Sequence, residues 1–225
     1  MKERPILFNA EMVKAIIKGR KTMTRRIVKM HHSKGCPWAY NKNDNSGYEW
    51  IEADPDFSGW DYRQPCRCIN CPYSIPGDRL WVRETYYRYG FWKKNGLTEA
   101  GKQKWKFFAR SPVVKYYDNP PDFIKPNSYR ETAWYKRPSI FMPRWASRIT
   151  LEITRVRVER LQEITEEDAA KEGLQDWYPD PKKPNGAPYM TNKRRFQDLW
   201  DSINGKKCPW NSNPWVWCIS FRRVN

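Results

Sequence analysis

The longest regular pattern in this 225-residue sequence is an alternation of apolar and polar residues over residues 148–161, which predicts a β-strand. The alternation changes phase near Thr154 and Arg155, as happens where an extra residue enters a strand as a β-bulge. A strand with one apolar face is stable only when that face is buried against other elements. We therefore expect a sheet in which this segment is a main strand.

The rest of the sequence supplies shorter strands and three helices. Strand patterns occur at 5–8, 22–29, 79–87 and 215–224, with weaker candidates at 106–109 and 113–117. Helices are predicted at 10–18, from Thr165 to Gly173, and at about 191–203, where the expected apolar face comprises Phe196, Leu199, Trp200 and Ile203. This mixture favours a single α+β domain over residues 1–225, built on a small, curved or closed β-sheet.

The composition limits the class of protein. Lysine and arginine number 42 and aspartate and glutamate 25, a net charge of +17, yet 16% of the residues are aromatic. The aromatic content excludes a disordered polycation, and the longest apolar run, residues 215–219, is too short to span a bilayer. We recognise no secretion signal and expect a cytoplasmic protein with no membrane partner. A basic, aromatic-rich chain favours RNA or DNA as partner, the alternative being a charge that serves solubility alone.

Two segments are interpreted as inserts. Residues 31–75 carry four basic and six acidic residues in an otherwise basic chain, are rich in Gly, Asn, Pro and Trp, and show no helical or strand period. Residues 88–142 are basic and aromatic and are difficult to assign to regular elements. We expect both to extend from the main domain rather than to form its scaffold.

The first insert contains a cysteine cluster: Cys36, Cys66, Cys68 and Cys71. In a reducing cytoplasm such a cluster indicates metal or redox chemistry before disulfides. The spacing of Cys68 and Cys71 is that of a zinc knuckle, so the sequence predicts a structural zinc site, with His31 or His32 as substitute ligands. A polar insert has little core, and a metal would supply stability. The alternative is that one thiol is spare, because the spacing from Cys66 to Cys68 is not that of a second knuckle. The sequence shows no set of ligands with an open position, as a catalytic metal would need.

The densest basic cluster lies between Lys14 and Lys29, where the sequence has seven lysines and arginines and no acidic residue. Gly19 is expected to end the first helix, leaving Lys21 on the turn into the next strand. Because strand side chains alternate, Thr24 and Arg26 should share one face near that lysine. Neighbouring arginines would lower the pKa of Lys21, and a neutral lysine beside a hydroxyl can activate a nucleophile. The alternative is a basic edge that only contacts phosphate.

Residues 19–26 resemble the signature of the ASCH domain family, relatives of the RNA-binding PUA fold, which reads Gly-x-Lys-x-x-Glu-x-Arg. The chain matches it at Gly19, Lys21 and Arg26 and has Thr24 in place of the glutamate. Bacterial ASCH enzymes that hydrolyse N4-acetylcytidine carry threonine there too, in the stretch Gly-Arg-Lys-Thr-x-Thr-x-Arg found here. The stretches at 4–8, 77–84, 143–148 and 214–218 are similar to longer ASCH proteins encoded by phages and prophages.

The resemblance implies a PUA-like β-barrel with flanking helices and a catalytic set of Lys21, Thr24 and a downstream glutamate, which falls at Glu172. Lys21 would take a proton from Thr24 or from water, and the oxygen would attack an amide carbonyl on a base. Glu172 would protonate the leaving amine, and Arg26 or a backbone N–H would hold the oxyanion.

Other residues in the matched stretches are candidates for substrate binding, because arginine holds phosphate and aromatic rings stack on bases. They are Arg83, Glu84, Arg144, Trp145 and Arg148. For Trp145 the alternative interpretation is core packing.

The sequence thus supports three functional hypotheses. The first is a protein that binds RNA, DNA or a modified nucleoside. The second is an amidohydrolase acting on N4-acetylcytidine or a related base, with no catalytic cofactor. The third is a non-catalytic phage accessory protein that binds a host protein through its aromatic surface.

Overall fold

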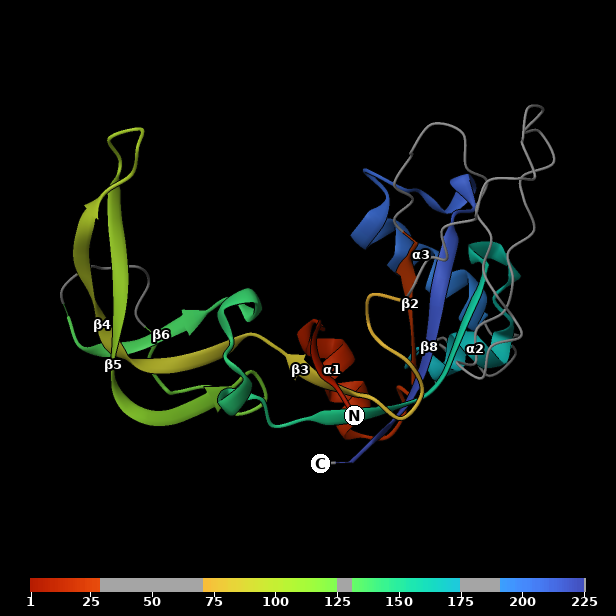
Figure 1. The fold of residues 1–225 in the computed structure, drawn as a ribbon, viewed down its shortest axis with the longest axis horizontal. Coiled ribbons are helices and arrows are strands. Elements are labelled where there is room, and N and C mark those ends of the chain that lie inside the picture. The colour runs from red at the N-terminus through yellow and green to blue at the C-terminus, as the bar shows by residue number, and fades with distance from the viewer. Residues whose placement is uncertain (29–70, 125–130, 175–190, 225) are drawn as a thin grey trace, which may run out of the picture. The chain divides into compact units, whose positions relative to one another are not determined.

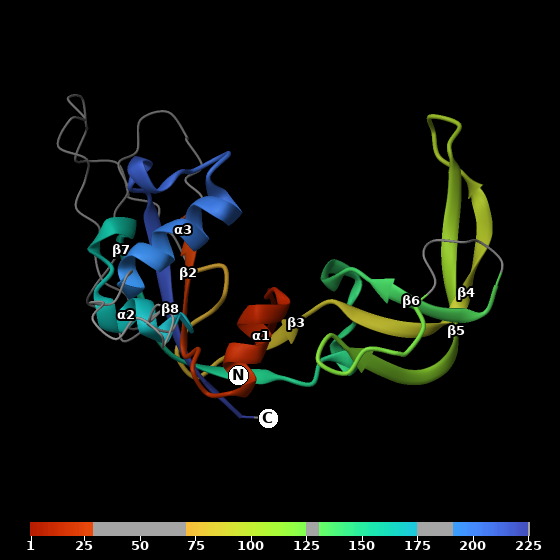
Figure 2. The same ribbon diagram turned by 180° about the vertical axis from the view of Figure 1, so that it is seen from behind.

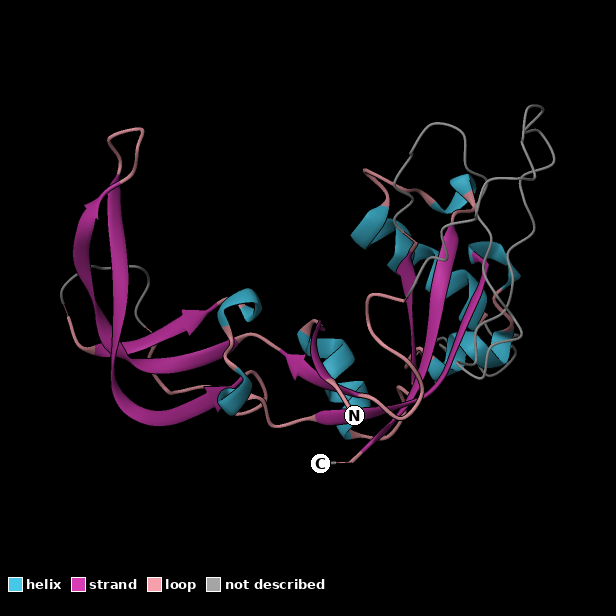
Figure 3. Cartoon of the chain, in the orientation of Figure 1, coloured by secondary structure: helices cyan, strands magenta, loops and turns pink. Residues whose placement is uncertain are grey.

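The described parts of the chain form an α+β fold with two sheets (Figure 3). The computed structural model describes residues 1–28, 71–124, 131–174 and 191–224. Its main elements are β1 (Glu3–Leu7), α1 (Ala10–Ile17), β2 (Met23–Ile27), β3 (Arg79–Arg83), β4 (Tyr86–Leu97), β5 (Gln103–Tyr116), β6 (Ala133–Arg137), β7 (Thr150–Arg160), α2 (Glu166–Lys171), α3 (Asn192–Asn204) and β8 (Trp215–Arg223). One sheet has the strand order β1-β3-β7-β8-β2 and the other the order β5-β4-β6.

The chain divides into two compact units. The first takes in the described residues of Met1–Arg4, Ala15–Leu80 and Thr150–Asn225, and the second those of Pro5–Lys14 and Trp81–Ile149. The second unit contains β4, β5 and β6, which lie largely in the region 88–142 that the sequence marks as a basic and aromatic insert.

In the first unit, β8 lies between β2 and β7 and pairs with both in antiparallel register (Figure 1). Arg25 of β2 and Arg157 of β7 are both direct cross-strand neighbours of Cys218 in β8. The register of β7 shifts between Ile153 and Arg155, which confirms the predicted bulge. The three strands therefore present a continuous row of side chains through Cys218 on one face.

Helices α2 and α3 cover that face (Figures 1 and 2). Thr165 and Thr191 cap their N-termini by accepting hydrogen bonds from backbone N–H groups, as their hydroxyls favour. The apolar part of this core comprises Leu161, Ile164, Ala169, Phe196, Trp200, Trp210, Val216 and Cys218. Trp217 and Ile219, which alternate with Cys218 along β8, are buried on the opposite face. This part of the sheet is therefore buried on both faces.

The apolar face expected for α3 is only partly correct. Phe196 and Trp200 are buried, but Ile203 is 54% exposed. The buried row starts at Asn192 and continues every four residues, so it passes beside Ile203 in the last turn. Among the described residues, no helix is long and apolar enough to cross a membrane.

The second unit contains a long hairpin, β4–β5, with β6 on the other side of β4 (Figure 3). The weak strand candidates at 106–109 and 113–117 are parts of the single strand β5. The strand expected at 79–87 is divided, since β3 ends at Arg83 and β4 begins at Tyr86. Tyr86, Met142 and Ala146 form a small buried cluster at the base of the hairpin.

The conformation and close packing of Gly173 lead to a prediction about stability. Its φ of +92° disfavours any other residue, and an added Cβ would lie 2.9 Å from the Ala15 Cβ and 3.0 Å from the Lys21 Cβ. We expect Gly173→Ala to lower the free energy of unfolding by about 2 kcal/mol or more, through backbone strain and overpacking. Urea unfolding measures the loss.

Gly19 provides the control for this prediction. It has a similar φ of +71°, but nothing lies within 4 Å of its Cβ position, so Gly19→Ala should cost only about 1 kcal/mol. Equal losses in the two variants would show that the close approach of Gly173 to Lys21 does not matter.

Candidate functional site

Lys21 and Glu172 are brought together by a local backbone pairing. The two residues form an isolated antiparallel bridge, and the Thr22 N–H donates to the Lys171 carbonyl at 2.9 Å. The segment that leads into β2 therefore lies along the C-terminal end of α2. Gly173 permits this close approach because it has no side chain.

The side chains of the same two residues form a buried ion pair. The Lys21 Nζ donates to the Glu172 Oε2 at 2.5 Å and to the Glu172 carbonyl at 2.9 Å. The lysine side chain is fully buried, and that of the glutamate is 4% exposed. An amine and a carboxyl that the resemblance assigns to one site are thus in direct contact, although 151 positions separate them in the sequence.

Arg25 extends this pair into a network. Its guanidinium lies 2.5 Å from Glu159, 2.9 Å from Asp168 and 3.5 Å from the Glu172 Oε1. Arg157 bonds to the same Glu159 at 2.8 Å and to Asp168. Three cations and three carboxylates therefore share one largely buried region, and their formal charges balance.

The sheet register explains why these groups meet. Arg25 and Arg157 flank Cys218 in adjacent strands, and Glu159 follows Arg157 by two positions on the same face of β7. The Cys218 thiol is hydrogen bonded to Glu159, and burial raises its pKa well above the ordinary value, so it is a neutral donor. Asp168 comes from the first turn of α2. The network thus joins α2 to three neighbouring strands.

Burial lowers the pKa of Lys21, and the charges of Arg26 and Arg25 lower it further, while Glu172 opposes the shift. The sequence predicts the direction but attributes it to the arginines; the main cause in the structure is burial. Burial alone would raise the pKa of Asp168, but Arg157 and Arg25 hold it below the ordinary value. The site thus combines a lysine with a weakened hold on its proton and a carboxyl group that stays charged.

Thr24 and Arg26 occupy the other face of β2. They pair with Ile219 and Trp217, the residues of β8 that alternate with Cys218. Thr24 is buried, and among the described residues its hydroxyl has no hydrogen bond to Lys21 or Glu172. The Arg26 charge nevertheless acts on Lys21. The structure therefore pairs Lys21 directly with Glu172. It places Thr24 on the face of β2 opposite to the one that carries Arg25.

The candidate substrate-binding residues lie in the second unit, where most make internal contacts. The buried Glu84 accepts two hydrogen bonds from Arg148, at 2.9 and 3.0 Å, and Arg148 also bonds to Asp118 at 2.8 Å. Arg83 donates to the carbonyls of Met142, at 3.1 Å, and Ile140. These pairings hold the guanidinium groups against the protein itself.

Arg144 and Trp145 lie in a short 3-10 helix, Arg144–Ala146. The alternative prediction that Trp145 packs in the core is wrong, because its side chain is 58% exposed. The Arg88 guanidinium lies 4.9 Å from the centroid of its ring. Ala146 is the residue of this turn that enters the core. Trp145 is therefore accessible to a ligand.

The predicted zinc site falls mostly outside the described residues. This holds for Cys36, Cys66 and Cys68 and for the substitute ligands His31 and His32. Cys71 is described and is buried. Within the described ranges, no cluster of three or more histidine, cysteine, aspartate or glutamate side chains could hold a metal ion.

The expected site residues do not include Arg157 and Glu159, and the sequence pattern predicts no structural role for Arg25. A usable signal exists: each is a charged residue within a strand whose neighbours are apolar, and such residues need partners when the strand is covered. Comparison of the chain with protein-family models, curated proteins and solved structures gave no match.

Arg25→Met should destabilise the protein by about 3–5 kcal/mol, because it leaves buried carboxylates without their shared cation. Arg222→Met is the control, since Arg222 pairs with Glu152 on the surface and its side chain is 67% exposed, so its loss should cost about 0–1 kcal/mol. Chemical unfolding measures both. Similar losses in the two variants would contradict the account of a buried network.

The lowered pKa of Asp168 predicts an acid-sensitive contribution to stability. A carboxyl with a depressed folded-state pKa stabilises the fold above its unfolded pKa of about 3.9 and loses this effect as the pH falls through the folded value. Asp168→Asn should therefore be less stable than the wild type at pH 7, and the gap should narrow below about pH 4. Unfolding free energies measured across this range test it; a gap that does not change with pH would contradict it.

Proposed function

We propose that the protein is an amidohydrolase that removes an acyl group from the exocyclic nitrogen of a nucleobase, as in N4-acetylcytidine, on an ASCH/PUA-like barrel. The observation that carries the proposal is the contact between Lys21 and Glu172. These are the positions that the ASCH resemblance assigns to the catalytic amine and carboxyl. A buried pair of this kind is also a plausible general base and general acid on physical grounds.

The geometry supports a proton shared within the pair. Burial favours the neutral form of Lys21, and the 2.5 Å hydrogen bond from its Nζ to Glu172 is the path along which the proton would move. The shift creates a neutral amine, which can act as a base, and a protonated carboxyl, which can act as an acid. Arg25 lies 3.5 Å from the other oxygen of Glu172 and so helps to position this carboxyl.

The reaction would consume one water. Lys21 takes a proton from water, and the water oxygen attacks the acyl carbonyl carbon; Thr24, which the resemblance also assigns to the catalytic set, lies on the other face of β2 and has no part in this step. Glu172 protonates the base nitrogen as the carbon–nitrogen bond breaks, while Arg26 stabilises the oxyanion. The products are a carboxylic acid and the unmodified base.

The test is release of acetate and cytidine from N4-acetylcytidine by the purified protein. We expect Lys21→Met and Glu172→Gln each to lower kcat by at least about 10²-fold, the usual contribution of a positioned acid or base. Lys18→Met and Glu167→Gln are matched controls, because both side chains are exposed in the same segments. Circular dichroism would confirm that the variants fold.

Two results would contradict the proposal. One is turnover that survives in folded Lys21→Met protein. The other is a wild-type protein that releases no acid from any N-acylated cytosine, adenine or guanine nucleoside, whether free or within an oligonucleotide.

A further inference from the structure

One face of the sheet β5-β4-β6 combines aromatic rings with cations. Phe91 of β4 lies directly opposite Phe108 of β5, and their rings stack at 5.6 Å with an angle of 17°. Lys93 lies opposite Lys106 at the next pair on this face. Arg110 lies over the Phe91 ring at 4.8 Å. We call these five residues the cation–aromatic face.

The opposite face of the same sheet is the packed one. There Phe107 makes edge contacts with Trp92 at 5.4 Å and with Tyr135 at 5.9 Å, and Tyr135 is almost completely buried. Arg137 covers both Trp92 and Phe107. On the cation–aromatic face, by contrast, Lys93, Lys106 and Arg110 are exposed and the Phe108 side chain is 38% exposed. This face is therefore accessible to a ligand.

The charges on the cation–aromatic face indicate a polyanion. Lys93 and Lys106 face each other across the strands, an arrangement that destabilises a sheet unless an anion lies between or beside the charges. From Tyr86 to Tyr116 the sequence has eight lysines and arginines and a single acidic residue, Glu99. The hairpin does not balance its own charge, so an external anion would relieve the repulsion.

The rings narrow the choice of polyanion. Phe91 and Phe108 offer stacking surfaces that suit flat, unpaired bases, which a duplex and an acidic peptide do not present. The exposed cation–π contact of Lys106 with Phe108, at 5.5 Å, is weak enough for a stacking base to displace. Single-stranded nucleic acid matches both the charge and the rings.

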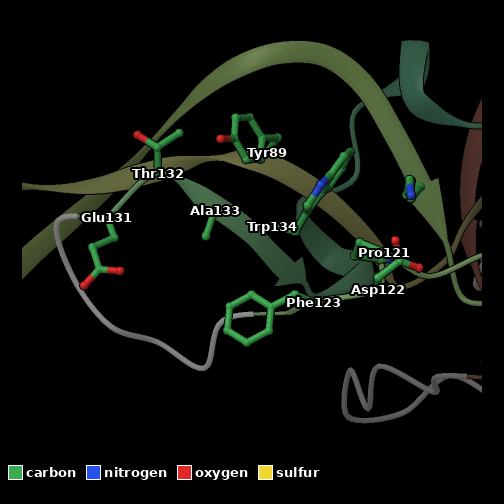
Figure 4. A pocket seen from close by; sticks show the side chains of 9 residues that line it. Tyr89, Pro121, Asp122, Phe123, Glu131, Thr132, Ala133 and Trp134 are labelled. Carbon is green, nitrogen blue, oxygen red and sulfur yellow. The ribbon is translucent and has the colours of Figure 1, made fainter.

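A pocket of about 380 Å³ lies on the same sheet, within the size range of small-ligand sites (Figure 4). Tyr89 and Trp134, opposite each other on β4 and β6, line it with rings 5.7 Å apart, together with Phe123. Asp122 and Glu131 also line it, as does Lys115, whose ammonium lies 5.4 Å from the Trp134 ring centroid. The two carboxylates outnumber the one cation and can accept hydrogen bonds from base amino groups, and the rings offer stacking surfaces, so this lining suits a base better than a phosphate.

We propose that the cation–aromatic face and this pocket bind single-stranded nucleic acid. Bases stack on Phe91 and Phe108, phosphates contact Lys93, Lys106 and Arg110, and one base enters the pocket beside Tyr89 and Trp134. The inference concerns the second unit alone and does not depend on catalysis at Lys21.

The experiment measures the affinity of fluorescein-labelled 12-mers of uridine and of thymidine by fluorescence anisotropy. Phe108→Ala should weaken binding by about 5-fold to 150-fold, the usual effect of losing one stacking ring. Ile203→Ala removes a comparably exposed apolar side chain from α3 and should leave the affinity unchanged. Binding of either sugar type supports the proposal.

The salt dependence tests the cations separately. Removing both lysines, in Lys93→Ala with Lys106→Ala, should reduce the slope of log K against log salt by about 1.4, or 0.7 for each lost phosphate contact. The exposed pair Lys206→Ala with Lys207→Ala is the control and should leave the slope unchanged.

Three outcomes would overturn the proposal. They are a Phe108→Ala variant that binds as the wild type does, a 12-base-pair duplex that binds as tightly as the single strands, and polyglutamate that competes as well as an oligonucleotide. Anisotropy reports binding by the wild-type protein whether or not that protein releases acetate. Failure of catalysis and failure of this surface are therefore distinguishable.

Discussion

Six buried or partly buried charged groups hold the first unit together. Lys21, Arg25 and Arg157 oppose Glu159, Asp168 and Glu172. Taking such groups out of water is costly, and the cost is offset only when every group keeps its partners. The network therefore specifies how α2 packs on β2, β8 and β7, because any other docking would leave a buried charge unpaired. Cys218, at the centre of the row, fits there because its thiol is small and can donate to Glu159.

The same constraint gives the site its chemical character. A lysine placed in a wet cleft would remain charged, and an isolated buried lysine would simply lose its proton. Lys21 lies between these limits, since burial lowers its pKa and Glu172 opposes the change. Arg25 holds the second oxygen of Glu172 and thus positions the carboxyl that faces the lysine. The stability of the first unit and the chemistry proposed for Lys21 therefore depend on the same few contacts.

The regular elements of the first unit follow from the sequence, and the site follows only in part. Residues 148–161 show their strand and bulge directly, and Thr165 and Thr191 mark two helix starts. Only the ASCH resemblance predicts that Lys21 and Glu172 belong to one site. Their spacing in the sequence carries no such information, because 151 positions separate them. Side-chain alternation along β2 puts Thr24 and Arg26 on the face that the sequence predicts for the site. Arg25 lies on the opposite face, so the same pattern predicts no role for it.

The second unit was harder to predict for a different reason. Strands are usually recognised by apolar residues alternating with polar ones. In β4 and β5 the packed face is aromatic, and the other face carries both rings and cations, as at Phe91 and Lys93. Apolar residues therefore occur on both faces, and the sequence does not alternate regularly between apolar and polar residues. The break between 106–109 and 113–117 corresponds to an irregularity within the single strand β5, because its pairing with β4 shifts register between Ala109 and Val114.

The central claim is that Lys21 has a weakened hold on its proton and shares it with Glu172. The most direct measurement is titration of the Lys21 Nζ by ¹⁵N NMR in the wild type and in Glu172→Gln. The account predicts a pKa below the ordinary lysine range, which falls further in the variant because the opposing carboxylate charge is gone. A Lys21 that titrates in the ordinary range, or whose pKa is the same in both proteins, would contradict it.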